Sequence, residues 1–358
     1  MRINSTNKRS WASLFDKNGK SLFLIMVLVL SFTLLFLFFV SFLQFPLPQQ
    51  ENHLYPSDEH PSSDVFDEER WSMEIDRVGP REAYGKFKAS YQSSPLIPKR
   101  HLAVHSFGEL LYKKIGVEGL EVCDEVFQFG CFHGFLGHAI QEEGLGIIPR
   151  VKRICREHEK SDNCFHGIGH GILSFVGYEE KDLLQSLEFC RNLSLSFPKE
   201  TSQCTGGVFM EYNFRTMLAD GKPRSFDLTT PFAPCDSMPL EFRPSCYYWQ
   251  SQWFVTVLYG DWEQKYEETG KLCEMVQNLE EQIQCFLGAG ILAGQSADWD
   301  PSRATMLCQH MLERGELVCR AGAARAFFGE SSLRSLAKML CEGSTDTTVC
   351  FTLANIPQ

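Results

Sequence analysis

Four histidines in two copies of one short motif are the side chains of this chain best suited to chemistry. Residues 131–138 read CFHGFLGH and residues 164–171 read CFHGIGHG, so Cys-Phe-His-Gly followed by Gly-His occurs twice. The four histidines are His133, His138, His166 and His170. Imidazole nitrogen is a ligand that zinc, copper, iron and nickel accept. The duplicated motif therefore predicts a transition-metal site, with zinc, iron or copper as the cofactor.

The spacing of these histidines predicts how their side chains meet. His166 and His170 are four residues apart, so both imidazoles share one face of an α-helix. His133 and His138 are five apart, and on a regular helix their directions differ by about 140°. The alignment of the two motifs demands one extra residue there, so we predict a π-bulge, or a broken first turn, between Gly134 and His138. With that bulge, all four imidazoles point into one groove between adjacent helices.

A carboxylate adds to the candidate site. Glu211 occupies, in the third repeat, the position that matches His138 in the first. A glutamate at this place is a candidate fourth or fifth metal ligand, or a general base. The predicted catalytic set is therefore Glu211, His166 and His170, and the predicted reaction class is metal-dependent oxidation–reduction or hydrolysis.

Two other interpretations of the histidines stay open. In the first, the imidazoles hydrogen-bond neighbouring carbonyls and only support helix packing, and the protein is a non-enzymatic interaction scaffold that binds a protein partner. In the second, they sense acid pH, because imidazole titrates near neutrality. His105 and His158 are weaker candidates for the same site.

Fourteen cysteines, all of them after residue 122, form seven pairs along the chain. Members of a pair are 8 to 14 residues apart, and pairs recur every 32 to 45 residues. A period in this range is typical of a repeat array. Zinc ligands usually have two to four residues between them, so the wider spacing favours disulfides. The predicted pairs are Cys123 with Cys131, Cys155 with Cys164, Cys190 with Cys204, Cys235 with Cys246, Cys273 with Cys285, Cys308 with Cys319, and Cys341 with Cys350.

The pairs predict an all-α fold. In each repeat the first cysteine falls near the end of one helical pattern and the second near the start of the next, so a disulfide would link the two arms of a helical hairpin. We expect a solenoid of about seven such hairpins. In its cysteine pairing the chain resembles the cysteine-rich members of the Sel1-like/tetratricopeptide superfamily. That resemblance implies disulfide-linked helical hairpins and no particular activity.

Glycine recurs three positions after the second cysteine of five repeats, at residues 134, 167, 207, 288 and 322. Glycine inside a helix costs about 1 kcal/mol relative to alanine, so its recurrence needs a reason. We expect each of these helices to approach a neighbouring helix closely at the glycine.

The front of the chain predicts a membrane anchor. Residues 22–45 carry no charge, and this run is long enough to span a hydrocarbon core of about 30 Å. We expect a cytoplasmic tail over 1–20, a transmembrane signal anchor over 21–45 and a flexible acidic stalk over 46–100. Residues 1–20 carry five basic side chains and one acidic one, which places them inside the cell. Residues 101–358 would form the extracytoplasmic domain of a single-pass type II membrane protein.

The compartment and the partners follow from cysteine usage and charge. Disulfides persist in oxidising surroundings, such as the secretory lumen, the cell surface or the periplasm. Asn192 lies in the one glycosylation sequon beyond the apolar segment. The net charge of −11 argues against nucleic acid as a partner.

Overall fold

The structure is a computed structural model that describes residues 66–91, 97–124, 126–127, 129–157, 161–193, 197–218, 222–330 and 333–357. Across these ranges the fold is all-α, and none of these residues lies in a β-strand. The predicted tail, the predicted anchor and the first part of the predicted stalk lie outside them. Within them, no helix combines the length and the apolar character that a bilayer-spanning segment needs.

Two helices occupy part of the predicted stalk. They are α2 (Glu68–Val78) and α3 (Pro80–Tyr91). The side chains of Trp71 and Phe87 are buried and their rings are in edge-to-face contact, with centroids 5.3 Å apart. Asp67 caps α2 by accepting a hydrogen bond from the Arg70 backbone N–H at 2.9 Å. The expectation of a flexible stalk is therefore wrong for 68–91, because a few apolar side chains suffice to bury one face of each helix.

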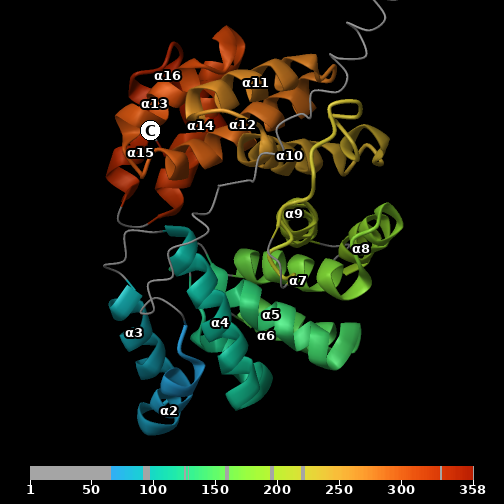
Figure 1. Cartoon of the computed structure of the whole chain (residues 1–358), viewed down its shortest axis with the longest axis vertical. Helices are drawn as coiled ribbons and strands as arrows, with labels where there is room; N and C mark the ends of the chain where they lie inside the picture. The colour runs from blue at the N-terminus through green and yellow to red at the C-terminus, as the bar shows by residue number, and fades with distance from the viewer. Residues whose placement is uncertain are drawn as a thin grey trace, which may run out of the picture. The chain divides into compact units, whose positions relative to one another are not determined.

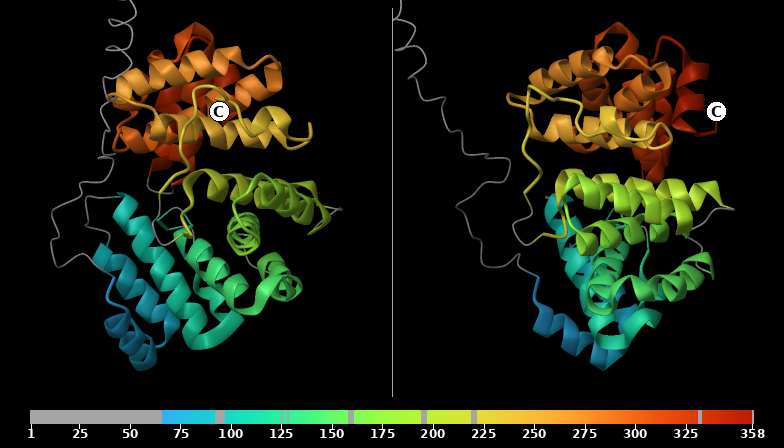
Figure 2. Two further views of the ribbon diagram at one scale, coloured as in Figure 1. Left: turned by 45° about the vertical axis from the view of Figure 1, so that its right-hand side comes forward. Right: turned by 90° about the vertical axis from the view of Figure 1, so that its right-hand side faces the viewer.

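The rest of the chain alternates between two kinds of element (Figure 1). A series that we call the stacked helices packs in chain order, each helix against the next. It comprises α4 (Ile97–Ile115), α5 (Gly130–Glu143), α7 (Ser161–Val176), α9 (Pro198–Phe214), α10 (Arg243–Val257), α12 (Leu279–Ser296), α14 (Leu312–Gly329) and α16 (Thr347–Ala354). Figure 2 shows α4, α5, α7 and α9 beside one another in two further views.

Further helical elements alternate with the stacked helices along the chain, and we call them the first arms. They comprise η1 (Gly116–Val122), η2 (Gly144–Ile147) with α6 (Ile148–Glu157), α8 (Glu180–Leu193), η3 (Cys235–Ser237), α11 (Trp262–Met275), α13 (Pro301–Gln309) and α15 (Arg334–Glu342). Local signals set their ends. Asp300, for example, accepts hydrogen bonds from the backbone N–H groups of Ser302 and Arg303, and Pro301 begins α13.

The seven predicted disulfides are confirmed. Each links a cysteine in or just after a first arm to a cysteine in the following stacked helix, with Cα atoms 5.4 to 5.6 Å apart. The described residues include all fourteen cysteines, and none of these is free. The bonds join Cys123 to Cys131, Cys155 to Cys164, Cys190 to Cys204, Cys235 to Cys246, Cys273 to Cys285, Cys308 to Cys319, and Cys341 to Cys350.

The hairpins that these bonds close are not all alike. In the fourth pair the first arm is only the 3₁₀ turn η3, which contains Cys235, and its partner Cys246 lies in the first turn of α10. In three other pairs the second cysteine lies well inside its stacked helix rather than near the start, as Cys204 does in α9, Cys285 in α12 and Cys319 in α14. The all-α, disulfide-linked architecture is thus shown, whereas a regular solenoid stays a prediction.

The recurrent glycines mark close contacts between stacked helices, as predicted. A Cβ atom added to Gly134 of α5 would lie 1.9 Å from the carbonyl oxygen of His105 on α4. A Cβ atom on Gly207 of α9 would lie 1.9 Å from the carbonyl oxygen of His166 on α7. No side chain fits at such distances, so the helices meet at their backbones. Both carbonyls belong to histidines, and the contacts therefore bring imidazole-bearing turns of successive helices together.

Candidate metal centre

Five histidines from three stacked helices gather at one place in the described structure. His101 and His105 come from α4, His133 comes from α5, and His166 and His170 come from α7. They form two overlapping groups of three, and within each group one nitrogen from every imidazole lies within 4.8 Å of the others. The groups are His101, His105 and His133, and His133, His166 and His170. His133 belongs to both.

Each helix that supplies two histidines presents them four residues apart. On α7 the Nε2 atoms of His166 and His170 are 3.2 Å apart, so the two imidazoles share a face as the spacing predicts. On α4 the Nε2 atoms of His101 and His105 are 3.0 Å apart. Two nitrogens that ligate one transition metal at about 2.0–2.1 Å lie about this far apart.

Hydrogen bonds to the outer ring nitrogens orient three of the imidazoles. His101 donates from Nδ1 to the carbonyl oxygen of Phe127 at 2.8 Å. His170 donates from Nδ1 to Oε2 of Glu211 at 3.0 Å. His166 hydrogen-bonds the backbone of Gln203. Metal-ligating histidines commonly donate their second nitrogen to a carboxylate or carbonyl in this way, which directs the other nitrogen toward the ion.

Glu211 supports His170 rather than joining the ring of converging nitrogens. Its Oε2 accepts from His170 Nδ1 at 3.0 Å and from Thr216 Oγ1 at 2.6 Å. Its Oε1 accepts from the Met217 backbone N–H at 3.0 Å and from the Tyr178 hydroxyl. Burial raises the pKa of Tyr178 well above its ordinary value, so this phenol stays protonated and donates. With four donors on its two oxygens, Glu211 is placed to position His170 and is poorly placed to accept a proton as a general base.

Burial keeps four of the imidazoles neutral, those of His101, His105, His133 and His166. His133 is 3% exposed, His170 is fully buried, and His105 is 8% exposed. Desolvation lowers the pKa of His105, His133 and His166 well below 6.5, and repulsion between the charged forms of neighbouring imidazoles lowers it further. Desolvation also lowers the pKa of His101 to about 4, although its bond to the Phe127 carbonyl opposes this shift. Neutral imidazole is the form that binds a metal ion.

His138 lies outside the cluster, contrary to prediction. Helix α5 is α-helical from Gly130 to Glu143, without the π-bulge that would have turned His138 toward His133. The five-residue spacing therefore places His138 on a different face. There its Nδ1 is 3.7 Å from Glu109 Oε1 and its Nε2 is 3.8 Å from Glu142 Oε1.

The sequence interpretation missed His101 and undervalued His105. The signal was present, since His101 and His105 are four residues apart, as His166 and His170 are. It was overlooked because α4 lacks the Cys-Phe-His-Gly motif. His158 lies outside the described residues.

An aromatic side chain lies beside the α7 pair. The rings of Trp249 on α10 and His166 have centroids 5.3 Å apart. Gly206 on α9 makes room for this contact, because a Cβ atom there would lie 3.1 Å from Trp249 Nε1 and 3.4 Å from His166 Nδ1. His166 keeps partial exposure, as His101 does.

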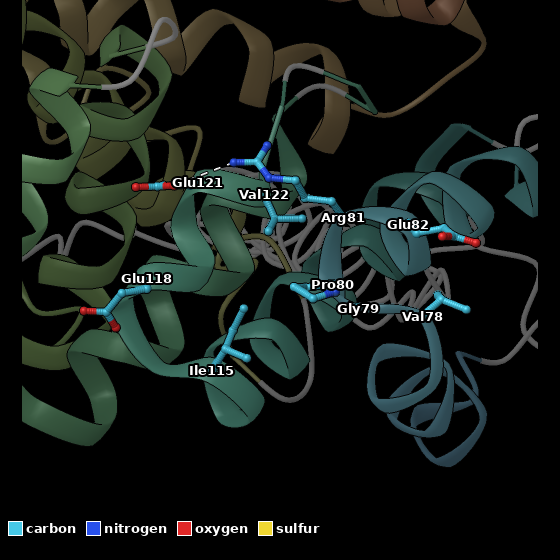
Figure 3. A pocket seen from close by; sticks show the side chains of 9 residues that line it. All are labelled: Val78, Gly79, Pro80, Arg81, Glu82, Ile115, Glu118, Glu121 and Val122. Carbon is cyan, nitrogen blue, oxygen red and sulfur yellow. Dashed lines mark ion pairs between the residues drawn. The ribbon is translucent and has the colours of Figure 1, made fainter.

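Two other features lie away from the histidines. Asn192 is exposed, as a glycosylation acceptor must be, but it lies in the last turn of α8 rather than in a connecting loop. A pocket of about 420 Å³ lies between the start of α3 and η1, and Figure 3 shows its lining. Across this pocket Arg81 and Glu121 form an ion pair at 3.6 Å, and none of the five histidines reaches it.

Comparisons with known proteins gave no match: no protein-family model fits the chain, and no curated protein or solved structure is significantly similar to it. The likeness to Sel1-like repeats therefore rests on the cysteine pairing alone. The chain is a disulfide-rich helical protein with histidine groups that could hold a metal ion.

Proposed function

We propose that this protein binds a transition-metal ion through His133, His166 and His170. One observation carries the proposal. The Nε2 atoms of His166 and His170 are 3.2 Å apart, and each of these two histidines and His133 offers one nitrogen within 4.8 Å of the others. Nitrogens that ligate one transition-metal ion lie at about this spacing. Burial disfavours a proton on His133 and on His166, and neutral imidazole is the form that binds a metal ion.

The donor set supports a choice of metal and a kind of chemistry. Three imidazoles suit zinc, copper or iron, and among divalent ions copper binds most tightly to a site of this type. Three protein ligands leave a coordination position open, as in catalytic rather than structural sites. We propose a metal-dependent oxidoreductase or hydrolase on this basis. In it, Glu211 holds the imidazole of His170 in one tautomer and orientation.

The disulfides support an oxidising compartment for this centre. The membrane anchor over 21–45 and the type II orientation belong to the same proposal, and they rest on the apolar run and the flanking charges of the sequence. A protein partner on the surface of the stacked helices is the alternative function. It requires the five histidines to be packing residues only.

Metal analysis of the full, untagged chain tests the proposal. The chain, produced in an oxidising compartment, should carry bound metal in a fixed ratio, and chelation should lower its thermal stability. His166→Gln with His170→Gln should abolish binding at this group, whereas His138→Gln, the matched control on α5, should leave it intact. A wild-type chain that binds no zinc, copper or iron, and melts at the same temperature with chelator, would be a scaffold.

A further inference from the structure

We propose that the histidine cluster holds two metal ions and that His133 ligates both, one through each ring nitrogen. This inference rests on the proposed function, because it adds a second ion to the centre that His166 and His170 begin. The second ion would be bound by His101, His105 and His133.

The α4 pair repeats the geometry of the α7 pair. His101 donates its outer nitrogen to the Phe127 carbonyl and directs Nε2 inward, as His170 does with Glu211. The Nε2 atoms of His101 and His105 are 3.0 Å apart, compared with 3.2 Å for the α7 pair. Each pair thus offers two nitrogens that converge at one place, and each needs a third ligand from outside its own helix.

His133 lies between the two pairs. Its ring centroid is 5.4 and 5.2 Å from those of His101 and His105, and 5.4 and 4.5 Å from those of His166 and His170. Its side chain is only 3% exposed, yet its Nδ1 has no hydrogen-bond partner among the described residues. An unpartnered buried imidazole nitrogen is costly, because the hydrogen bond it makes to water in the unfolded chain is lost without replacement. A metal ion at that nitrogen removes the cost.

A ligand count favours two ions over one. A single ion at His133, His166 and His170 leaves the α4 pair as a buried histidine pair without a ligand role. Two ions use all five imidazoles and give each ion three nitrogens, provided that both nitrogens of His133 take part. For this, the imidazole of His133 releases its one ring proton to solvent and becomes an imidazolate anion. The imidazolate and the buried Glu211 carboxylate then supply two negative charges close to the two cations.

Copper(II) is the probe for the test, because the chain has no free cysteine to compete for it. The metal-stripped full chain, titrated with copper(II), should bind two ions per chain. Two copper(II) ions joined by an imidazolate couple magnetically, so the electron paramagnetic resonance signal should be much weaker than two isolated ions give. His138→Gln should bind two ions with the same weak signal.

Variants separate the two sites. His101→Gln with His105→Gln should bind one copper per chain, with the full signal of an isolated ion. His133→Gln should restore the full signal for any copper that remains bound. One copper in the wild-type chain, unaffected by the α4 substitutions, would overturn this inference and leave the proposed function standing. Two copper ions without coupling would overturn the shared role of His133, and no copper at all would overturn both proposals.

Discussion

Nδ1 of His170 lies 3.0 Å from Oε2 of Glu211, and both side chains are completely buried. The two residues are 41 positions apart and belong to different stacked helices, α7 and α9. Their contact holds Nδ1 of His170 toward Glu211 and therefore turns Nε2 toward the cluster. The affinity of the His166–His170 pair for a metal ion should therefore depend on Glu211, although this carboxylate would not itself be a ligand.

Glu211→Gln should lower metal affinity ten- to a hundredfold. Residues that orient a ligating histidine have effects of about this size, and glutamine lacks the charge that favours a cation. Competition with a chromophoric chelator gives the affinity, and a urea unfolding curve of the same variant separates it from loss of fold. Glu142→Gln on α5, an exposed carboxylate near His138, is the control. Equal affinities for the two variants would remove the positioning role of Glu211.

Gly207→Ala should destabilise the fold by about 1–3 kcal/mol or more, the usual cost of overpacking. The added methyl group would lie 1.9 Å from the His166 carbonyl oxygen and 3.1 Å from the His170 backbone nitrogen, so α7 and α9 must separate. Gly85→Ala on α3 is the matched control, since nothing lies within 4 Å of a Cβ atom there. It should stabilise the protein by up to about 1 kcal/mol. Urea unfolding measures both, and a neutral Gly207→Ala would show that the helices are not in contact.

The metal-free chain should lose stability as the pH falls from about 6.5 to about 4. An imidazole in the unfolded chain takes up a proton near pH 6.5, whereas burial lowers the pKa of His101 to about 4 in the fold. Between these values the unfolded state binds more protons, so acid favours unfolding and stability is complete only above this range. His101 alone should account for a loss on the order of 3 kcal/mol.

Unfolding midpoints in urea at several pH values measure this slope. His101→Gln should flatten the part of the profile between about pH 6.5 and about pH 4 that this residue contributes. A wild-type profile that is level across this interval would show that the histidines are hydrated in the fold.

Removal of the disulfide between α11 and α12, by Cys273→Ala with Cys285→Ala, should cost about 2–3 kcal/mol. The two cysteines are 12 residues apart, and the chain-entropy account gives this size for loops of about that length. Metal binding should be unchanged, because neither helix supplies a histidine to the cluster. Urea unfolding under non-reducing conditions measures the loss of stability, and the metal-to-protein ratio measures metal binding. A loss of bound metal would indicate that the stacked helices transmit the change to α7.

Sequence spacing alone determined the local relationships in this protein. The seven disulfides could be predicted because each closes a short loop, and few other pairings satisfy so regular a period. The shared face of His166 and His170 could be predicted because four residues make about one helical turn. The close approach at Gly134 and Gly207 could be predicted because glycine recurs there against its helix propensity.

Tertiary structure alone decided which distant residues meet. The contact of His101 and His105 with His133 depends on how α4 packs on α5, and no motif marks α4. The polar stretch 68–91 is helical because Trp71 and Phe87 can be buried against α4, where both contact the ring of Phe107. His138 lies outside the site because α5 is a regular helix from Gly130 to Glu143. A regular helix pairs its buried backbone N–H and C=O groups, which a bulge would disrupt. Glu211 supports His170 because the packing of α9 on α7 brings His170 and Tyr178 to its two oxygens, while Thr216 and Met217, directly after α9, supply the other two donors.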